Sequence, residues 1–149
     1  MASMYVVYHG KDGITNIARN IHHRAIQLAE ALQKLGFKQL NTYFFDTLLI
    51  DSQGLNPQIR AVAEAEGMNF RFIGEDRLTI SIDETTQKED LLAIASVFAT
   101  IAGKENETPK LIRTEPQLAE SMQRKSDFLT HPVFNSYRSE TEMLRYIKR

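Results

Sequence analysis

Side chains that can donate, accept or exchange protons gather in one stretch near the C-terminal end of the sequence, between Phe128 and Glu142. The stretch is typical of a loop that leads into a helix. Such loops present side chains to a site or hold an anion at the helix N-terminus. The alternative is a loop that is simply docked by its aromatic residues, Phe128 and Phe134. His131, Asn135, Ser139 and Glu140 are among the polar residues of this stretch.

Three further histidines lie near the N-terminus. His22 and His23 are adjacent, and adjacent helical residues point about 100° apart, so they lack the i, i+3 or i, i+4 spacing of a metal site. We interpret both as part of the polar face of a long helix, and no metal site is predicted. His9 lies between a strand-like run, Tyr5–Tyr8, and a glycine, where it either faces a ligand or caps a turn.

An acidic cluster, Asp83-Glu84-Thr85-Thr86, marks the junction between a predicted strand and a predicted helix. Oxygen-rich side chains of this kind could bind a cation. They are also the residue types that satisfy free N–H groups at a helix N-terminus and oppose the helix dipole. The structural interpretation is the simpler one, and we favour it.

The sequence lacks the common motifs of nucleotide binding and nucleophilic catalysis. It contains neither G-x-x-x-x-G-K-[ST] nor G-x-G-x-x-G, and it has no G-x-S-x-G elbow. Because it has no cysteine, disulfides, thiolate metal sites and cysteine nucleophiles are excluded. Its lysines lie in polar or linker contexts, where a desolvated, activated amine is not expected.

The composition is that of an ordinary globular domain. Of the 149 residues, 42% are hydrophobic and 25% charged, and the formal net charge is −1. This balance excludes wholesale disorder and gives no electrostatic basis for binding nucleic acid or an anionic membrane. There is no apolar run of roughly 20 residues to cross a membrane and no signal-peptide pattern. A soluble, cytoplasmic protein is therefore expected.

Hydrophobic periodicity predicts an amphipathic helix over residues 14–35. Its apolar residues recur at alternating spacings of four and three, which places them on one stripe. Asp12 is the predicted N-cap, and Gly36 is the glycine expected to end the helix. The stripe consists of Ile14, Ala18, Ile21, Ala25, Leu28, Leu32 and Leu35.

The pattern up to Gly103 predicts an α+β fold, a small sheet with helices packed on one side. A mostly buried strand is expected at 43–50, and a hairpin whose strands contain Phe70 and Phe72, then Leu78, Ile80 and Ile82, is expected to turn at 74–76. Two further helices are expected. The first starts with Asn56 as N-cap and Pro57 and ends at Gly67, and the second starts with a Thr86/Glu89 capping box and ends at Gly103.

Beyond Gly103 the apolar residues become sparse and irregularly spaced. We therefore expect a small α+β domain at 1–103, an extended linker or strap at 104–138, and the start of a truncated helix at 139–149. Within the strap, Pro116 could open a short helix that runs to Met122. Ser139 and Glu142 form the capping box expected to start the last helix.

Three segments resemble one protein family. Met4–Gly10 is similar to a "MYAVYHG" run, Ile82–Thr86 to "LDETT", and the stretch from Phe128 through Tyr146 to "THPVFN…SETEMLRY" of glycine dehydrogenase (decarboxylating), the P-protein of the glycine cleavage system. The three matches occur in the family's order and together cover nearly the whole chain. Arg138 departs from the pattern, because the family commonly has histidine there.

The resemblance implies a much longer parent oxidoreductase, with two homologous halves that each resemble a fold-type-I enzyme dependent on pyridoxal phosphate. It implies that the parent decarboxylates glycine and passes the aminomethyl group to the lipoyl H-protein, and that the parent is dimeric. The cofactor lysine of the family follows a histidine, and this sequence has no His-Lys pair. No cofactor is therefore expected on this chain, and no catalytic residue is assigned to it.

We therefore expect an internal segment of that parent. It would comprise the small C-terminal domain of the first half, a connecting strap and the opening helix of the second half. The segment is expected to be inactive by itself, with the remainder of the P-protein as its partner. His131, Asn135, Ser139 and Glu140 would line or support the active-site region of the intact enzyme. The alternative hypothesis is a free-standing regulatory α+β module that binds a small molecule.

Overall fold

A computed structural model of the chain describes residues 2–104, 111 and 118–148. These residues group into two units. The sheet unit is Asn20–Leu118, and the terminal unit combines Met1–Arg19 with Ala119–Arg149. The domain boundaries expected after 103 and 138 remain a prediction.

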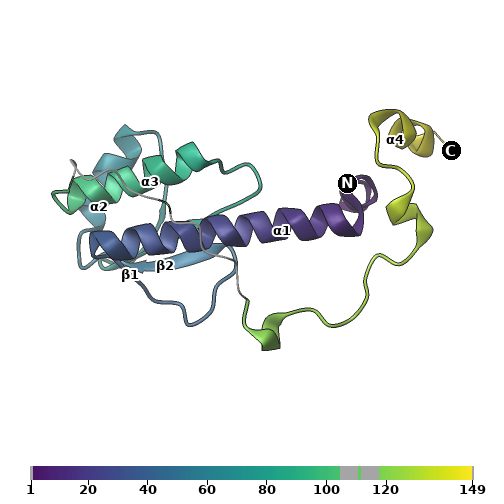
Figure 1. Cartoon of the computed structure of the whole chain (residues 1–149). Helices are drawn as coiled ribbons and strands as arrows, with labels where there is room; N and C mark the ends of the chain where they lie inside the picture. The colour runs from purple at the N-terminus through teal and green to yellow at the C-terminus, as the bar shows by residue number, and fades with distance from the viewer. Residues whose placement is uncertain (1, 105–110, 112–117, 149) are drawn as a thin grey trace. The chain divides into compact units, whose positions relative to one another are not determined.

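The sheet unit is built on a four-stranded antiparallel sheet with the strand order β1-β2-β4-β3. Figure 1 labels its first two strands, β1 and β2, together with the helices. Three helices accompany the sheet, so the expected α+β fold is confirmed. The strands are β1 (Lys38–Gln39), β2 (Thr47–Asp51), β3 (Arg71–Ile73) and β4 (Arg77–Ser81), and the helices are α1 (Ala2–Leu35), α2 (Asn56–Ala65) and α3 (Lys88–Ile101).

One face of this sheet forms the floor of the hydrophobic core. Leu48 on β2 lies opposite Ile80 on β4, and Ile50 lies opposite Leu78, so the four side chains share a face, and all are buried. Alternate residues such as Thr79 are more exposed, as expected for a sheet that is covered on one side. The helices contribute most of the other core residues, including Leu28, Leu32, Ile59, Leu91 and Phe98.

All three helices end in the same way, at a glycine with positive φ. At Gly36 (φ 103°), the amide of Gly36 donates to Gln33 O and that of Phe37 to Leu32 O, both at 3.0 Å. This pair of bonds is the Schellman motif, which satisfies the last helical carbonyls and needs a left-handed residue. The same two-bond pattern follows α2 at Gly67 and α3 at Gly103, so the three predicted helix ends are confirmed.

The predicted starts of α2 and α3 are wrong in detail. Leu55, not Asn56, is the N-cap of α2. The buried amide of Asn56 instead donates to the carbonyls of Gly74 and Arg77, at 2.9 and 3.0 Å, and so holds the β3–β4 turn against the helix. For α3 the capping box is shifted by one residue: Asp90 accepts from the amide of Gln87 at 2.7 Å.

The strand expected at 43–50 is only partly formed, because β2 begins at Thr47. The aromatic residues before it lie in a loop that packs on α1. The rings of Phe45 and His22 are stacked at 5.5 Å, and Phe44 lies 5.9 Å from the same imidazole. Phe44 and Phe45, which led to the prediction of a longer strand, instead make contacts with α1.

The strand-like run Tyr5–Tyr8 is helical, because α1 begins at Ala2. The rings of Tyr5 and His9 are 4.3 Å apart, a contact between residues i and i+4 that a helix provides and a strand does not. The helix is interrupted at Gly10 (φ 64°, ψ −176°) and continues beyond it. Asp12 therefore lies inside α1 and does not cap it.

The terminal unit adds three short elements after the gap in the described residues: η1 (Glu120–Met122), η2 (Pro132–Asn135) and α4 (Glu140–Ile147). The predicted capping box of Ser139 and Glu142 at the start of α4 is confirmed. Pro116 lies outside the described residues, so the helix expected from it is not tested. Over the part of the chain that is described, no helix combines the length and the apolar character needed to cross a membrane.

Replacing Asn56 by alanine should lower the free energy of unfolding by about 1–3 kcal/mol, because two carbonyls of the β3–β4 turn lose their donor. Urea denaturation measures the change. Gln58→Ala is the matched control: it removes an exposed amide from the same helix, and its effect should stay within about 0.5 kcal/mol. Equal effects of the two substitutions would show that the amide of Asn56 does not hold the turn.

Candidate functional site

Gly10 brings the N-terminal segment against the stretch that holds the candidate site residues. A Cβ atom at this position would lie 2.7 Å from the carbonyl oxygen of Phe134 and 3.4 Å from Nη2 of Arg138. The φ of 64° independently disfavours any residue with a side chain. Two independent constraints, the lack of room for a Cβ atom and the positive φ, therefore require glycine at position 10. Two of the segments that carry the family resemblance are in contact here.

The residues next to Gly10 and before the candidate stretch add a second connection. The amine of Lys11 lies 3.3 Å from a carboxylate oxygen of Asp127 and 5.4 Å from the ring centre of Phe128. The guanidinium of Arg124 lies 5.3 Å from the same ring centre. Phe128 therefore anchors this stretch through two cations, as well as through its partial burial.

His131 shapes the loop at the start of η2. Its Nδ1 accepts a hydrogen bond from the amide of Val133 at 3.2 Å, so the neutral ring carries its proton on Nε2. The hydroxyl of Ser136 donates to the carbonyl of Pro132 at 2.7 Å and closes the same turn. Because the imidazole is exposed, its Nε2–H remains available to a partner.

Asn135 is oriented by the residue that departs from the family pattern. Nη2 of Arg138 donates to Oδ1 of Asn135 at 2.9 Å, and the same guanidinium lies beside Gly10. Arg138 therefore links the end of η2 to the break in α1. The amide nitrogen of Asn135 is left as the donor that this residue can present.

Ser139 and Glu142 are occupied by the start of α4. One carboxylate oxygen of Glu142 accepts from the amide and the hydroxyl of Ser139, at 3.2 and 3.0 Å, and from the amide of Arg138 at 3.2 Å. These bonds, the one from the Ser139 hydroxyl foremost, hold the pKa of Glu142 below its ordinary value of 4.5. With Glu140 also in the first turn, carboxylates stand where an anion would bind, so this helix start presents side chains rather than an anion site.

The structure therefore places the four candidates on one continuous, exposed loop and helix start. Each of His131, Asn135 and Ser139 makes a local hydrogen bond that fixes its orientation. Glu140 is exposed on the first turn of α4. The contact of Gly10 with Phe134 and Arg138 was not predicted; the only signal for it in the sequence is the glycine itself.

The interpretation of His22 as part of a polar face is wrong. Its side chain is buried, only 5% exposed, and its Nδ1 donates to the carbonyl of Phe45 at 2.8 Å. It thereby holds the loop before β2 on α1. His23 is half-buried. The described residues contain no group of three side chains arranged to hold a metal ion.

Asp83 organises the turn between β4 and α3. Its Oδ1 accepts from the amide and hydroxyl of Thr85, at 2.9 and 2.7 Å, and from the amide and hydroxyl of Thr86, at 3.0 and 3.1 Å. These bonds, led by that from the Thr85 hydroxyl, lower the pKa of Asp83 below 3.8. The cluster thus stabilises the chain's own turn, and its threonines do not cap α3.

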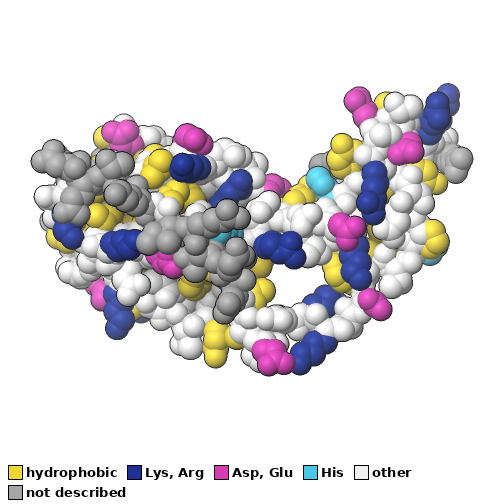
Figure 2. All heavy atoms as spheres, in the orientation of Figure 1, with side chains coloured by type: hydrophobic (Ala, Val, Ile, Leu, Met, Phe, Trp, Pro, Cys, Tyr) yellow, Lys and Arg dark blue, Asp and Glu magenta, His cyan; other side chains and the backbone are white. Residues whose placement is uncertain are grey.

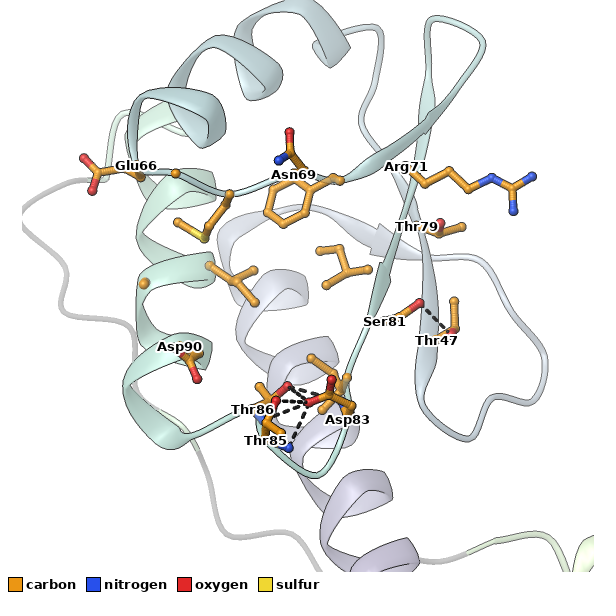
Figure 3. A pocket seen from close by; sticks show the side chains of 17 residues that line it. Thr47, Glu66, Asn69, Arg71, Thr79, Ser81, Asp83, Thr85, Thr86 and Asp90 are labelled. Atoms are coloured by element: carbon orange, nitrogen blue, oxygen red, sulfur yellow. Dashed lines mark hydrogen bonds between the residues drawn. The ribbon is translucent and has the colours of Figure 1, made fainter. Parts of the chain in front are cut away.

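A groove of about 860 Å³ opens beside this turn, within the sheet unit (Figure 3). The segment that leads into β3, residues 66–70, diverges from β4, and α3 closes the third side. The lining is apolar where Met68, Phe70 and Ile94 contribute to it and polar around the mouth. Asp83, Thr85 and Thr86 line it and belong to the acidic cluster that was weighed as a cation site and interpreted as structural; no other residue of the lining was considered for a site.

Comparison with known proteins assigns the whole chain to one kind of relative. Residues 1–98 match the family described as glycine cleavage system P-protein. Proteins named glycine dehydrogenase (decarboxylating) from Flavobacterium johnsoniae and Christiangramia forsetii are 44% and 40% identical over all 149 residues, and one from Bacteroides fragilis is 43% identical over 152 aligned residues. The chain spans only 16% of the length of each of these proteins.

Gly10→Ala should loosen the candidate stretch, at a local cost of about 2 kcal/mol or more, since strain at positive φ adds to the clash with Phe134. Amide hydrogen exchange of residues 131–138 should become faster. Gly54→Ala is the control, because Gly54 also has positive φ (80°) but its Cβ would meet nothing within 4 Å. Unchanged exchange in Gly10→Ala would contradict the requirement for glycine.

Ser139→Ala should raise the pKa of Glu142 towards 4.5, since it removes the largest cause of the lowered value. The stabilisation from this carboxylate is present above pH 4.5 and is lost as the pH falls through the lowered pKa. A carboxyl-detected NMR titration of wild type and variant measures both. Thr141→Ala, an exposed neighbour, should leave the midpoint unchanged; an equal change in both variants would exclude Ser139 as the cause.

Proposed function

The chain belongs to the glycine cleavage system P-protein family, and from this premise we propose that it is an internal segment of a glycine dehydrogenase (decarboxylating). The observation that carries the proposal is the combination of identity and coverage. Similarity extends over the full chain at 40–44%, yet the chain accounts for 16% of each relative. A segment with this relation to its relatives is a part of the enzyme rather than the enzyme itself.

The parent, on this proposal, uses pyridoxal phosphate to decarboxylate glycine and transfers the aminomethyl group to the lipoyl H-protein. The residues of this chain do not fit a covalent site for that cofactor. The described lysines are exposed or half-buried, and Lys11, Lys104 and Lys125 already contact Asp127, the carbonyl of Lys34 and Glu120. We therefore derive no step of the reaction from this chain, and the cofactor lysine belongs to another part of the parent.

The role of this chain is structural. Several large apolar side chains of the terminal unit reach the surface, among them Met4, Tyr8, Leu144 and Ile147, with 38–60% exposure. Figure 2 shows hydrophobic side chains on the surface over both parts of the chain. Exposed apolar surface of this kind is typical of a face that another part of a protein covers. The remainder of the P-protein is the partner that we propose for it.

The sheet unit serves as the small C-terminal domain of the first half of the parent, and α4 as the opening helix of the second half. An antiparallel sheet covered on one side supports this assignment. His131, Asn135, Ser139 and Glu140 would line or support the active-site region. Two observations support this role: the four side chains are exposed, and local hydrogen bonds orient those of His131, Asn135 and Ser139. The proposal also takes the parent enzyme to be a dimer in the bacterial cytoplasm.

The second candidate function is a free-standing module that binds a small molecule. The groove beside β4 is the observation that favours it, because its volume of about 860 Å³ is in the range of ligand sites. Among the described residues of the lining, every charged side chain is exposed, so none of them fixes a small ligand from a buried position. The relation to much longer relatives favours the segment.

The proposal predicts that the isolated chain does not release carbon dioxide from ¹⁴C-labelled glycine when pyridoxal phosphate and lipoylated H-protein are supplied. The intact reading frame that encodes it should do so under the same conditions. Activity of the isolated chain, or a reading frame of only these residues, would overturn the proposal. A clear rise in the melting temperature of the isolated chain with glycine would instead support the binding module.

A further inference from the structure

We propose that the groove beside β4 accepts an extended strand from the remainder of the parent polypeptide, which adds to the sheet next to Ser81. The strand would carry an apolar side chain towards Phe70 and a basic side chain towards the mouth of the groove. This inference rests on the proposed function in one respect, namely that a longer parent supplies the strand.

The register of the sheet turns the main chain of Ser81 towards the groove. The amide of Ile82 donates to the carbonyl of Asp46 at 3.0 Å, so residues 82, 80 and 78 exchange hydrogen bonds with the β2 side. In an antiparallel pair the residues between them point the opposite way. The N–H and C=O of Ser81 therefore point away from β2.

On that opposite side the ladder stops before it reaches Ser81. β3 begins at Arg71, which lies opposite Thr79, so no residue of β3 pairs with Ser81. Figure 3 shows the segment from Glu66 to Arg71 leaving β4 at this point, with Asn69 on the far side of the opening. Among the described residues, none pairs with Ser81 on this side, and such a position is a template for strand addition.

The side chains around this position suit a peptide. Thr47 and Ser81 share a hydrogen bond of 2.9 Å on the sheet, and Met68, Phe70 and Ile94 supply the apolar part of the lining. An added strand would place alternate side chains towards and away from that apolar surface. Such a strand would form hydrogen bonds with the main-chain N–H and C=O of Ser81 and would also cover the apolar lining. A small polar ligand would not do both.

The charge at the mouth selects a basic residue in the strand. Glu66, Asp83 and Asp90 contribute carboxylates, and Arg71 is the single cation among the described residues that line the groove. Oδ1 of Asp83 already accepts from Thr85 and Thr86, and Oδ2 of Asp90 accepts from the amide of Gln87, which leaves Glu66 and the second oxygen of each aspartate to face a partner. Complementarity of this kind orients a strand and fixes its register.

The source of the strand follows from the size of the relatives. Since the chain spans 16% of each relative, most of the parent lies outside these 149 residues and is linked covalently to them. A strand from the same polypeptide is held at high effective concentration, so it outcompetes a free peptide. We therefore assign the groove to the parent rather than to a separate protein.

Hydrogen exchange of the Ser81 amide tests the proposal without any substitution. The amide should exchange about 100-fold or more slowly in the intact parent than in the isolated chain, since it gains an acceptor only there. The amide of Ile80, which the β2 side already satisfies, serves as the internal control for overall stability. Equal exchange of Ser81 in both proteins would overturn the proposal, and so would protection of the isolated chain by glycine or pyridoxal phosphate.

A pair of variants provides an independent measurement. Ser81→Pro deletes the N–H that points into the groove, at a position that the ladder with β3 does not reach and where proline is therefore tolerated, whereas Ser81→Ala keeps that N–H. Both variants lose the hydroxyl bonded to Thr47. In the isolated chain the two should melt alike; in the intact parent the proline variant should melt several degrees lower. A proline variant that melts lower by the same amount in both proteins would contradict strand addition.

Carbon dioxide release from glycine is measured on the same preparation of the parent. Failure of the proposed function would appear as absent decarboxylation. Failure of the present inference would appear as an unprotected Ser81 amide in a parent that remains active.

Discussion

The sheet unit has one face of a four-stranded sheet to bury, and the position of every helix in it follows from that constraint. Leu48 and Ile50 on β2 pair with Ile80 and Leu78 on β4, so the register alone determines which side chains point inward. A shift of β2 by one residue against β4 would turn Leu48 and Ile50 outward. Two further features stabilise the arrangement that this register determines. One is the pair of hydrogen bonds from the Asn56 amide to the hairpin turn, and the other is the glycine at the end of each of the three helices.

Local patterns in the sequence predicted much of this fold. The glycines that end α1, α2 and α3 act within a few residues, and so does the capping box of Ser139 and Glu142. The apolar alternation of the hairpin and the helical stripe were also sufficient to predict an antiparallel hairpin and an amphipathic helix. In each case one element supplies all the atoms of the interaction, so neighbours in sequence are neighbours in space.

Several of the features that were missed depend on contacts between distant parts of the chain. His22 is buried because a loop 23 residues later stacks on it, and Asn56 is drawn from its capping position by carbonyls 18 and 21 residues away. The candidate residues of the terminal unit were named from the family resemblance and their polar types. The orientation of Asn135 depends on Arg138, whose guanidinium lies beside Gly10, and no local pattern connects Arg138 with Gly10.

Arg138 has a consequence for how this region responds to its surroundings. Where the family resemblance leads one to expect histidine, this chain has a guanidinium that bonds Asn135 and lies beside Gly10. An imidazole in that place would gain and lose its charge around neutral pH, whereas a guanidinium keeps its charge throughout. The contact therefore keeps its charge at any physiological pH in this chain, whereas histidine in the same place would make the charge of the contact depend on pH.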